Sequence, residues 1–139
     1  MDIRLITTDA ELRQAWPVMA QLRPHLSEAA FVALCRLQFD EGFELAALFD
    51  DARVRALAGF RVHHRLVSGK TLYVDDLVTD EAGRSRGYGA ALIAWLRNRG
   101  REQGCELLSL DSGVQRFGAH RFYLRERFDI SAHHFTQRL

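Results

Sequence analysis

The feature of this sequence that most constrains its fold is the stretch GRSRGYGAALIAWL, residues 83–96. It follows a run with the pattern of a β-strand, residues 71–80, and opens a run with the periodicity of a helix, residues 87–103. A glycine costs roughly 1 kcal/mol relative to alanine inside a helix, so a glycine-rich helix start needs a physical reason. We therefore predict a strand-to-helix junction at which the backbone approaches a ligand closely.

The residues of this junction have the chemistry of an anion-binding loop. The first turn of a helix has unpaired backbone N–H groups, and the helix dipole favours negative charge there. Gly87 and Gly89 let the backbone come close to a bulky anion, and Arg84 and Arg86 add positive charge. Together these features predict a loop that holds a phosphate group.

Two common phosphate-binding motifs do not fit this loop. A P-loop needs a lysine and then serine or threonine after its last glycine, and this chain has alanine there. The dinucleotide fingerprint needs a third glycine three residues after the second, and this chain has Leu92 there. The spacing that remains is arginine, two residues, glycine, one residue, glycine.

Hydrophobic periodicity and turn residues predict the other elements. Strands are expected over 2–7, 43–51, 53–66, 71–80, 105–112 and 128–139, and helices over 12–22, 28–41, 87–103 and 119–126. Antiparallel hairpins come first and one strand–helix–strand crossover comes later. This order predicts an α+β domain with a mixed, mostly antiparallel sheet.

The ends of the first two helices have recognisable signals. Thr8 and Glu11 have the spacing of a capping box, and Ser27 is placed to cap the second helix. Pro17 is expected to disturb the first helix, and Pro24 is expected to end it.

Composition narrows the classes of function. The chain has 139 residues and no repeat or linker, so we expect one domain over residues 1–139. No apolar run reaches the roughly 18 residues that cross a bilayer, and the N-terminus lacks a signal-peptide pattern. We therefore expect a cytoplasmic protein without a membrane partner. The net charge of +1 argues against a nucleic-acid partner, although all cations except Lys70 are arginine.

Cysteines and histidines give no metal-site pattern. Cys35 and Cys105 are too far apart in the sequence for a metal-binding motif, and we expect both to be small buried hydrophobes. The histidine pairs at 63–64 and 133–134 fall on predicted strands, where adjacent side chains point apart. We expect no metal, and a histidine lining a substrate pocket is the alternative role.

The spacing at Arg84, Gly87 and Gly89, directly after VDDLVTDEA, resembles the acetyl-CoA pyrophosphate loop of the GNAT superfamily of N-acetyltransferases. Downstream, the set Ala119, Phe122, Tyr123 and Phe128 resembles a second pattern of that family. The resemblance covers about residues 44–139 in order and character. It implies a GNAT-like α+β fold, with a mixed, mostly antiparallel central sheet and helices on both of its faces.

The resemblance implies that acetyl-CoA is bound by backbone groups of two segments. These are the strand edge at Leu77, Val78 and Thr79, and the loop of Arg84, Ser85, Arg86, Gly87, Tyr88, Gly89 and Ala90. The arginine side chains would have a secondary role, or would be plain surface residues.

Two residues are the catalytic candidates. The resemblance makes Tyr123 the candidate general acid for the departing thiolate; its alternative is an aromatic that fills the core. Asp75 and Asp76 are consecutive on a strand, so one of them is expected to face the substrate amine. We favour Asp75, which would share a face with Tyr73, Leu77 and Thr79. Both acids being structural is the alternative.

The implied function is transfer of an acetyl group from acetyl-CoA to a primary amine of a small molecule or peptide, by direct attack in a ternary complex. The alternative is a non-catalytic CoA-binding or interaction module of the same fold. A homodimer paired through the final strand would be in keeping with the family.

Overall fold

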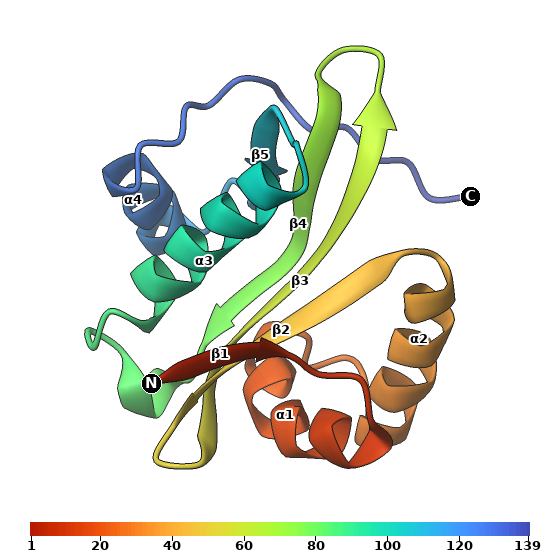
Figure 1. Cartoon of the computed structure of the whole chain (residues 1–139), viewed down its shortest axis with the longest axis vertical. Helices are drawn as coiled ribbons and strands as arrows, with labels where there is room; N and C mark the ends of the chain where they lie inside the picture. The colour runs from red at the N-terminus through yellow and green to blue at the C-terminus, as the bar shows by residue number, and fades with distance from the viewer. The chain divides into compact units, whose positions relative to one another are not determined.

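The computed structural model describes all residues, 1–139, as two compact units, Met1–Ser109 and Leu110–Leu139. The elements in chain order (Figure 1) are β1 (Asp2–Leu5), α1 (Asp9–Leu22), α2 (Glu28–Asp40), β2 (Phe43–Asp50), β3 (Arg53–Arg65), β4 (Gly69–Thr79), a 3-10 turn η1 (Glu81–Gly83), α3 (Tyr88–Glu102), β5 (Leu107–Leu110) and α4 (Phe117–Arg125).

One five-stranded sheet organises the first unit, in the strand order β1-β2-β3-β4-β5. The pairs β1–β2, β2–β3 and β3–β4 are antiparallel. The strand β5 returns after the crossover helix α3 and starts beside the start of β4, where Glu106 N–H donates to Lys70 O at 2.7 Å. The prediction of a mixed, mostly antiparallel sheet in an α+β fold is confirmed.

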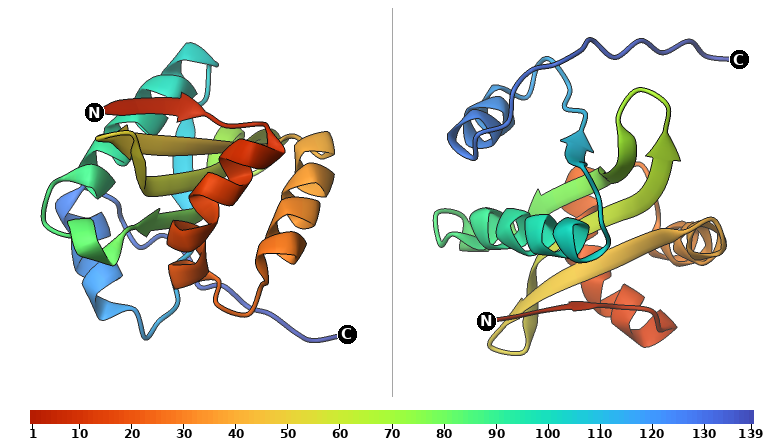
Figure 2. Two further views of the ribbon diagram at one scale, coloured as in Figure 1. Left: turned by 90° about the horizontal axis from the view of Figure 1, so that it is seen from below. Right: turned by 45° about the horizontal axis from the view of Figure 1, so that its top comes forward.

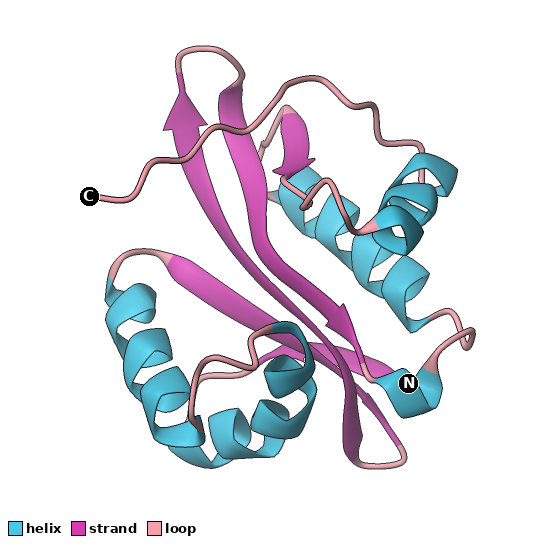
Figure 3. Cartoon of the chain, turned by 180° about the vertical axis from the view of Figure 1, so that it is seen from behind, coloured by secondary structure: helices cyan, strands magenta, loops and turns pink.

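Helices cover both faces of this sheet, as predicted (Figures 2 and 3). The pair α1 and α2 lies on one face and α3 on the other. The first face forms a continuous apolar cluster with buried members Ile6, Leu12, Ala15, Val18, Met19, Phe31, Cys35, Phe43, Leu45, Ala47, Phe49, Val54 and Leu57. On the second face Leu92, Ile93 and Leu96 of α3 are fully buried, and Trp95 meets the ring of Phe60 edge-on. Burying a side chain of this size contributes about 2 kcal/mol, so α3 is held firmly to the sheet.

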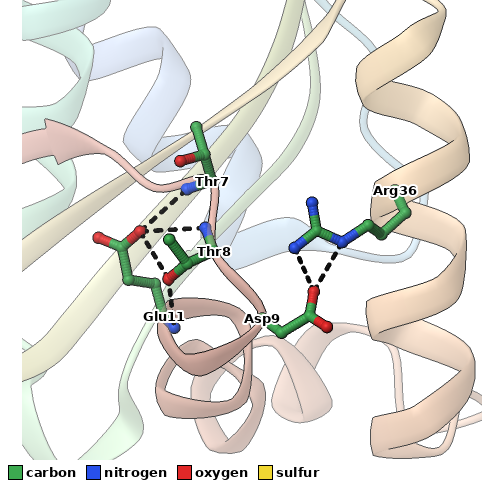
Figure 4. Close-up of polar contacts among 5 residues, drawn as sticks. All are labelled: Thr7, Thr8, Asp9, Glu11 and Arg36. Atoms are coloured by element: carbon green, nitrogen blue, oxygen red, sulfur yellow. Dashed lines mark hydrogen bonds and ion pairs between the residues drawn. The ribbon is translucent and has the colours of Figure 1, made fainter.

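The predicted capping box is present at the start of α1 (Figure 4). Glu11 N–H donates to Thr8 Oγ1 at 3.2 Å, and the N–H groups of Thr8 and Thr7 both donate to Glu11 Oε1 at 3.1 Å. These backbone bonds lower the pKa of Glu11. The guanidinium of Arg36 on α2 pairs with Asp9, so the cap also ties the two helices together.

The proline predictions have different outcomes. Pro24 follows the end of α1, as expected, but Pro17 lies inside α1 without interrupting it. The flanking residues Ala15, Val18 and Met19 are buried against the sheet. Their packing holds the turns on either side of the proline in place, which offsets the hydrogen bond lost at its missing N–H.

In the second unit α4 carries Tyr123, whose ring lies 5.5 Å from Phe122 and 5.8 Å from Phe128 between ring centres. The strand predicted over 128–139 is wrong: these residues form no strand, and 129–139 are all exposed. Alternation of apolar and polar residues does not by itself make a strand, which also needs ladder hydrogen bonds from a neighbour. The strand β5 is also shorter than predicted and only half-buried. None of the helices has the length and apolar character needed to span a membrane.

Candidate functional site

The junction between β4 and α3, residues 80–90, has the geometry of an open helix start. Gly87 stands immediately before α3 with φ +80°, a left-handed conformation that glycine adopts without steric cost. No side chain caps this helix, and its first backbone bond joins Ala91 N–H to Gly87 O at 3.0 Å. The N–H groups of Tyr88, Gly89 and Ala90 are therefore left for a ligand or solvent.

Tyr88 anchors this junction from inside the protein. Its side chain is 2% exposed, and its hydroxyl donates to Asp50 Oδ2 on β2 at 2.6 Å. This hydrogen bond lowers the pKa of the Asp50 carboxyl, which keeps it an acceptor. The ring lies against Gly83, where any Cβ would fall 2.7 Å from Tyr88 Cε2. The side chain of Tyr88 thus points away from any ligand at the helix start, and only its N–H faces one.

A second set of bonds fixes the end of β4. Asp80 accepts hydrogen bonds from Gln21 Nε2 and Arg55 Nη1, each at 3.1 Å, and Gln21 Oε1 accepts from Glu81 N–H at 2.9 Å. The Gln21 bond is the main cause of the lowered pKa of Asp80. Hydrogen bonds within the protein therefore hold both ends of the loop, at Asp80 and Glu81 and at Tyr88. Arg84, by contrast, is exposed and lies 3.6 Å from exposed Glu81.

The last residues of β4 extend beyond its neighbour β5. The strand β5 has 4 residues against 11 in β4, and it starts beside Lys70. It can follow only the first half of β4 at about 3.3 Å per residue. Leu77, Val78 and Thr79 pair with β3 on one side. Their other side lies past the end of β5.

A β-bulge in β4 corrects the predicted orientation of the acids. Gly59 pairs with Asp76 and Phe60 pairs with Val74, so Asp75 is an extra residue between the two pairs. The bulge breaks the alternation of side chains, and both acids line one cavity under α1 and α2. Asp75 shares this face with Asp76 and Val78, and not with Leu77 and Thr79 as predicted.

This cavity, which we call the acid cavity, has a volume of about 260 Å³. Its lining comes from α1, α2, the loop between them, β2 and β4. The members are Met19, Arg23, His25, Leu26, Phe31, Leu34, Cys35, Gln38, Phe43, Leu45, Asp75 and Asp76. The absence of a side chain at Gly59 leaves room for two lining residues of the cavity. A Cβ at this position would lie 2.4 Å from Phe43 Cζ and 2.7 Å from Asp76 Oδ2.

Each acid of the cavity pairs with an arginine. Arg23 Nη2 lies 2.8 Å from Asp76 Oδ1 and also donates to the backbone oxygen of Asp75 at 3.0 Å. Arg61 Nε lies 3.0 Å from Asp75 Oδ2. Burial raises the pKa of Asp76, and the hydrogen bond from Arg23 opposes that shift. Oδ2 of Asp75 is the oxygen that pairs with Arg61, and the other carboxylate oxygen, Oδ1, has no arginine partner.

Sequence reasoning did not find several residues of this cavity. Arg23 and Arg61 have no local signal, because their partners lie 53 and 14 residues away in the sequence. The histidine of the cavity is His25 in the loop between α1 and α2, and not one of the two histidine pairs. Cys35 is buried as expected, which raises the pKa of its thiol to about 12, whereas Cys105 is only half-buried.

Tyr123 is 8% exposed. Burial raises its pKa, so its hydroxyl is protonated at neutral pH and can donate a proton or a hydrogen bond. Its role as general acid stays a prediction.

Comparison with known proteins supplies the family context. The model of the acetyltransferase (GNAT) family matches residues 9–128. The chain is 35% identical over 124 residues to the uncharacterized N-acetyltransferase YhdJ of Bacillus subtilis (strain 168), a match that covers 87% of this chain and 86% of that protein. It is 36% identical over 80 residues to the aminoalkylphosphonate N-acetyltransferase of Salmonella typhimurium, with 58% of this chain and 50% of that protein covered.

A solved structure shares the fold. It is that of AAC(6')-Iy in complex with the bisubstrate analogue CoA-S-monomethyl-acetylneamine, with a TM-score of 0.87, 18% identity, and 99% of this chain and 97% of that chain covered. At this level of identity the similarity speaks for the fold alone.

Proposed function

The chain belongs to the acetyltransferase (GNAT) family, as an acyltransferase enzyme, and on this premise we propose that it transfers the acetyl group of acetyl-CoA to a primary amine. The observation that carries the proposal is the uncapped start of α3, where Gly87 presents the N–H groups of Tyr88, Gly89 and Ala90. Three backbone donors at the positive end of a helix suit a diphosphate. The exposed Arg84 and Arg86 add positive charge, and Ser85 N–H completes the loop.

The fit of acetyl-CoA extends from this loop to β4. Backbone groups of Leu77, Val78 and Thr79 lie beyond the end of β5, so they can pair with the amide groups of the pantetheine arm. Acetyl-CoA supplies the activated thioester. The AAC(6')-Iy complex, in which a CoA-based bisubstrate analogue is bound to the same fold, supports this assignment.

We assign the acceptor amine to the acid cavity. Asp75 has a carboxylate oxygen without an arginine partner, which suits it to bind an ammonium group and to take its proton, directly or through water. The amine nitrogen then bonds to the acetyl carbon as the carbon–sulfur bond breaks. Tyr123 is the proposed donor of a proton to the leaving thiolate, and the products are the amide and free CoA.

Release of CoA thiol tests the proposal. Purified protein is incubated with acetyl-CoA and a panel of primary amines, and thiol is measured together with acetylated amine. Equal amounts of both products are expected. Binding of acetyl-CoA by calorimetry without thiol release across a broad panel would favour the non-catalytic CoA-binding module instead. A homodimer, an amine on a peptide and a cytoplasmic location remain predictions within this proposal.

A further inference from the structure

We infer that the acceptor amine is carried on an apolar carbon stem, and that neither an additional acidic group nor several amino groups are recognised with it. This inference rests on the proposed function and adds the chemical class of the acceptor. The stem can belong to a free alkyl or arylalkyl amine or to a lysine side chain, since both present an ammonium group on methylenes.

The first argument is the lining of the acid cavity. Its floor is apolar, and Met19, Phe31, Phe43 and Leu45 are each less than 5% exposed. Leu34 lies on the apolar face of α2 but is 42% exposed, because it stands at this cavity and not in the packed core. An apolar stem that covers these side chains gains about fourfold in affinity for each methylene it buries.

The second argument is the state of the charges. Both arginines beside the cavity are engaged: Arg23 binds Asp76 and the backbone of Asp75, and Arg61 binds the Asp75 carboxylate. A phosphonate or carboxylate on the acceptor would meet guanidinium groups whose charge an aspartate already balances, and it would lie beside the two carboxylates. The open carboxylate oxygen of Asp75 accepts one ammonium group without such a change.

The third argument is size. The cavity of about 260 Å³ is smaller than the 300 to 1,000 Å³ typical of pockets that hold drug-sized ligands. Phe31, Leu34 and Phe43 offer no acceptor to further amino groups, because the acceptors of the lining are confined to His25, Gln38, Asp75 and Asp76. A polycationic acceptor whose further amino groups face the apolar lining therefore loses hydration there without compensation.

The experiment measures kcat/KM by thiol release for n-alkylamines from propylamine to hexylamine, 2-phenylethylamine, 2-aminoethylphosphonate, neamine and a lysine-containing peptide. We expect kcat/KM to rise about fourfold per methylene until the cavity is filled, and to exceed that of the phosphonate and of neamine by about 10²-fold. The ratio between hexylamine and the lysine peptide distinguishes the two sources of the stem. A preference for the phosphonate or neamine, or no dependence on chain length, overturns the inference.

Paired variants place the effect in the cavity. Leu34→Ser removes an apolar side chain at the cavity and should flatten the dependence on chain length, with the KM for acetyl-CoA unchanged. Leu37→Ser, on the same helix but 59% exposed and outside the cavity, is the matched control and should keep the full dependence. An equal loss in both variants overturns the assignment to the cavity. Absence of thiol release with every amine, while acetyl-CoA still binds, instead overturns the proposed function.

Discussion

The β4–α3 junction and the acid cavity are two regions of one unit that are built in opposite ways. The junction uses backbone N–H groups of consecutive residues, and its own buried side chain, Tyr88, points inward to Asp50. The cavity uses side chains from two helices, the loop between them and two strands. Ligand binding at the junction should therefore be lost when a bulky or negatively charged side chain is added, but should depend little on which small side chain is present. Binding in the cavity should depend on the identity of each lining side chain.

The largest effect is expected for a variant that changes the junction and leaves the acid cavity as it is. Gly89→Glu puts bulk and a negative charge beside the proposed diphosphate, and like charges in such a position cost several kcal/mol. We expect affinity for acetyl-CoA to fall by about 10³-fold or more, measured by calorimetry. Ala29→Glu adds the same charge at an exposed position of α2 and is the control, for which unchanged affinity is expected. Normal binding by the Gly89 variant would remove the loop assignment.

A second variant tests the catalytic step and changes no residue of the junction or of the acid cavity. Tyr123→Phe keeps the ring between Phe122 and Phe128 but lacks the proton, so turnover should fall about 10²-fold with little change in either KM. Because burial raises the pKa of Tyr123 above its ordinary value of 10.0, its ionisation should not limit the wild-type rate below that pH. Stopped assays across the pH range measure both effects. Full activity of the variant would move the acid role to another group.

A third variant acts on the cavity alone. Arg23→Ala leaves the buried Asp76 carboxylate unpaired, and we expect a loss of about 2 kcal/mol in the free energy of unfolding at pH 7.5 with acetyl-CoA affinity kept. This value is below the cost for a fully buried pair because the Arg23 side chain is 38% exposed. Urea denaturation measures the loss.

The pH dependence of this loss has a definite sign. The pKa of Asp76 is already raised by burial, and loss of Arg23 raises it further. The folded variant then binds a proton that the unfolded chain releases above pH 3.8, so its stability should recover as the pH falls toward that value. The double variant Arg23→Ala/Asp76→Asn has no such group and should lose this recovery. An identical pH dependence of the two variants would contradict the role of the ion pair.

The smallest expected effect tests how firmly the junction is held. Tyr88→Phe removes the hydrogen bond to Asp50, worth about 1 kcal/mol, which corresponds to about a fivefold loss of acetyl-CoA affinity if the loop loosens. Asp50→Asn keeps an acceptor oxygen for the hydroxyl and should lose less. Calorimetric titration distinguishes the two. An increase in the acceptor KM in the Tyr88 variant would show that the two regions are coupled.

The contrast also explains what the sequence could predict. The glycine-led start of α3 and the caps at Thr8 and Ser27 depend on residues close together in the chain, and the structure has all of them. Such features need only local chemistry, which a sequence shows directly.

The acid cavity depends on tertiary structure, which no local pattern describes. The faces of Asp75 and Asp76 were predicted wrongly because the bulge arises from the pairing of β4 with Gly59 and Phe60 of another strand. Arg23 reaches its acid across 53 residues of sequence. The pattern of residues 128–139 is that of a strand, but a strand also needs a neighbour to pair with, and these residues form no strand.

The bare backbone at Gly59 has a consequence for how this enzyme can diversify. A single methyl group at that position would meet Phe43 and Asp76, both of which line the cavity, from behind. If the acid cavity holds the acceptor as proposed, the choice of amine can shift through Gly59, which is not among the residues that line the cavity. On the proposed function, one substitution would change the acceptor and leave the binding of acetyl-CoA unchanged. Gly59→Ala is a natural first step in evolving this protein toward smaller amines.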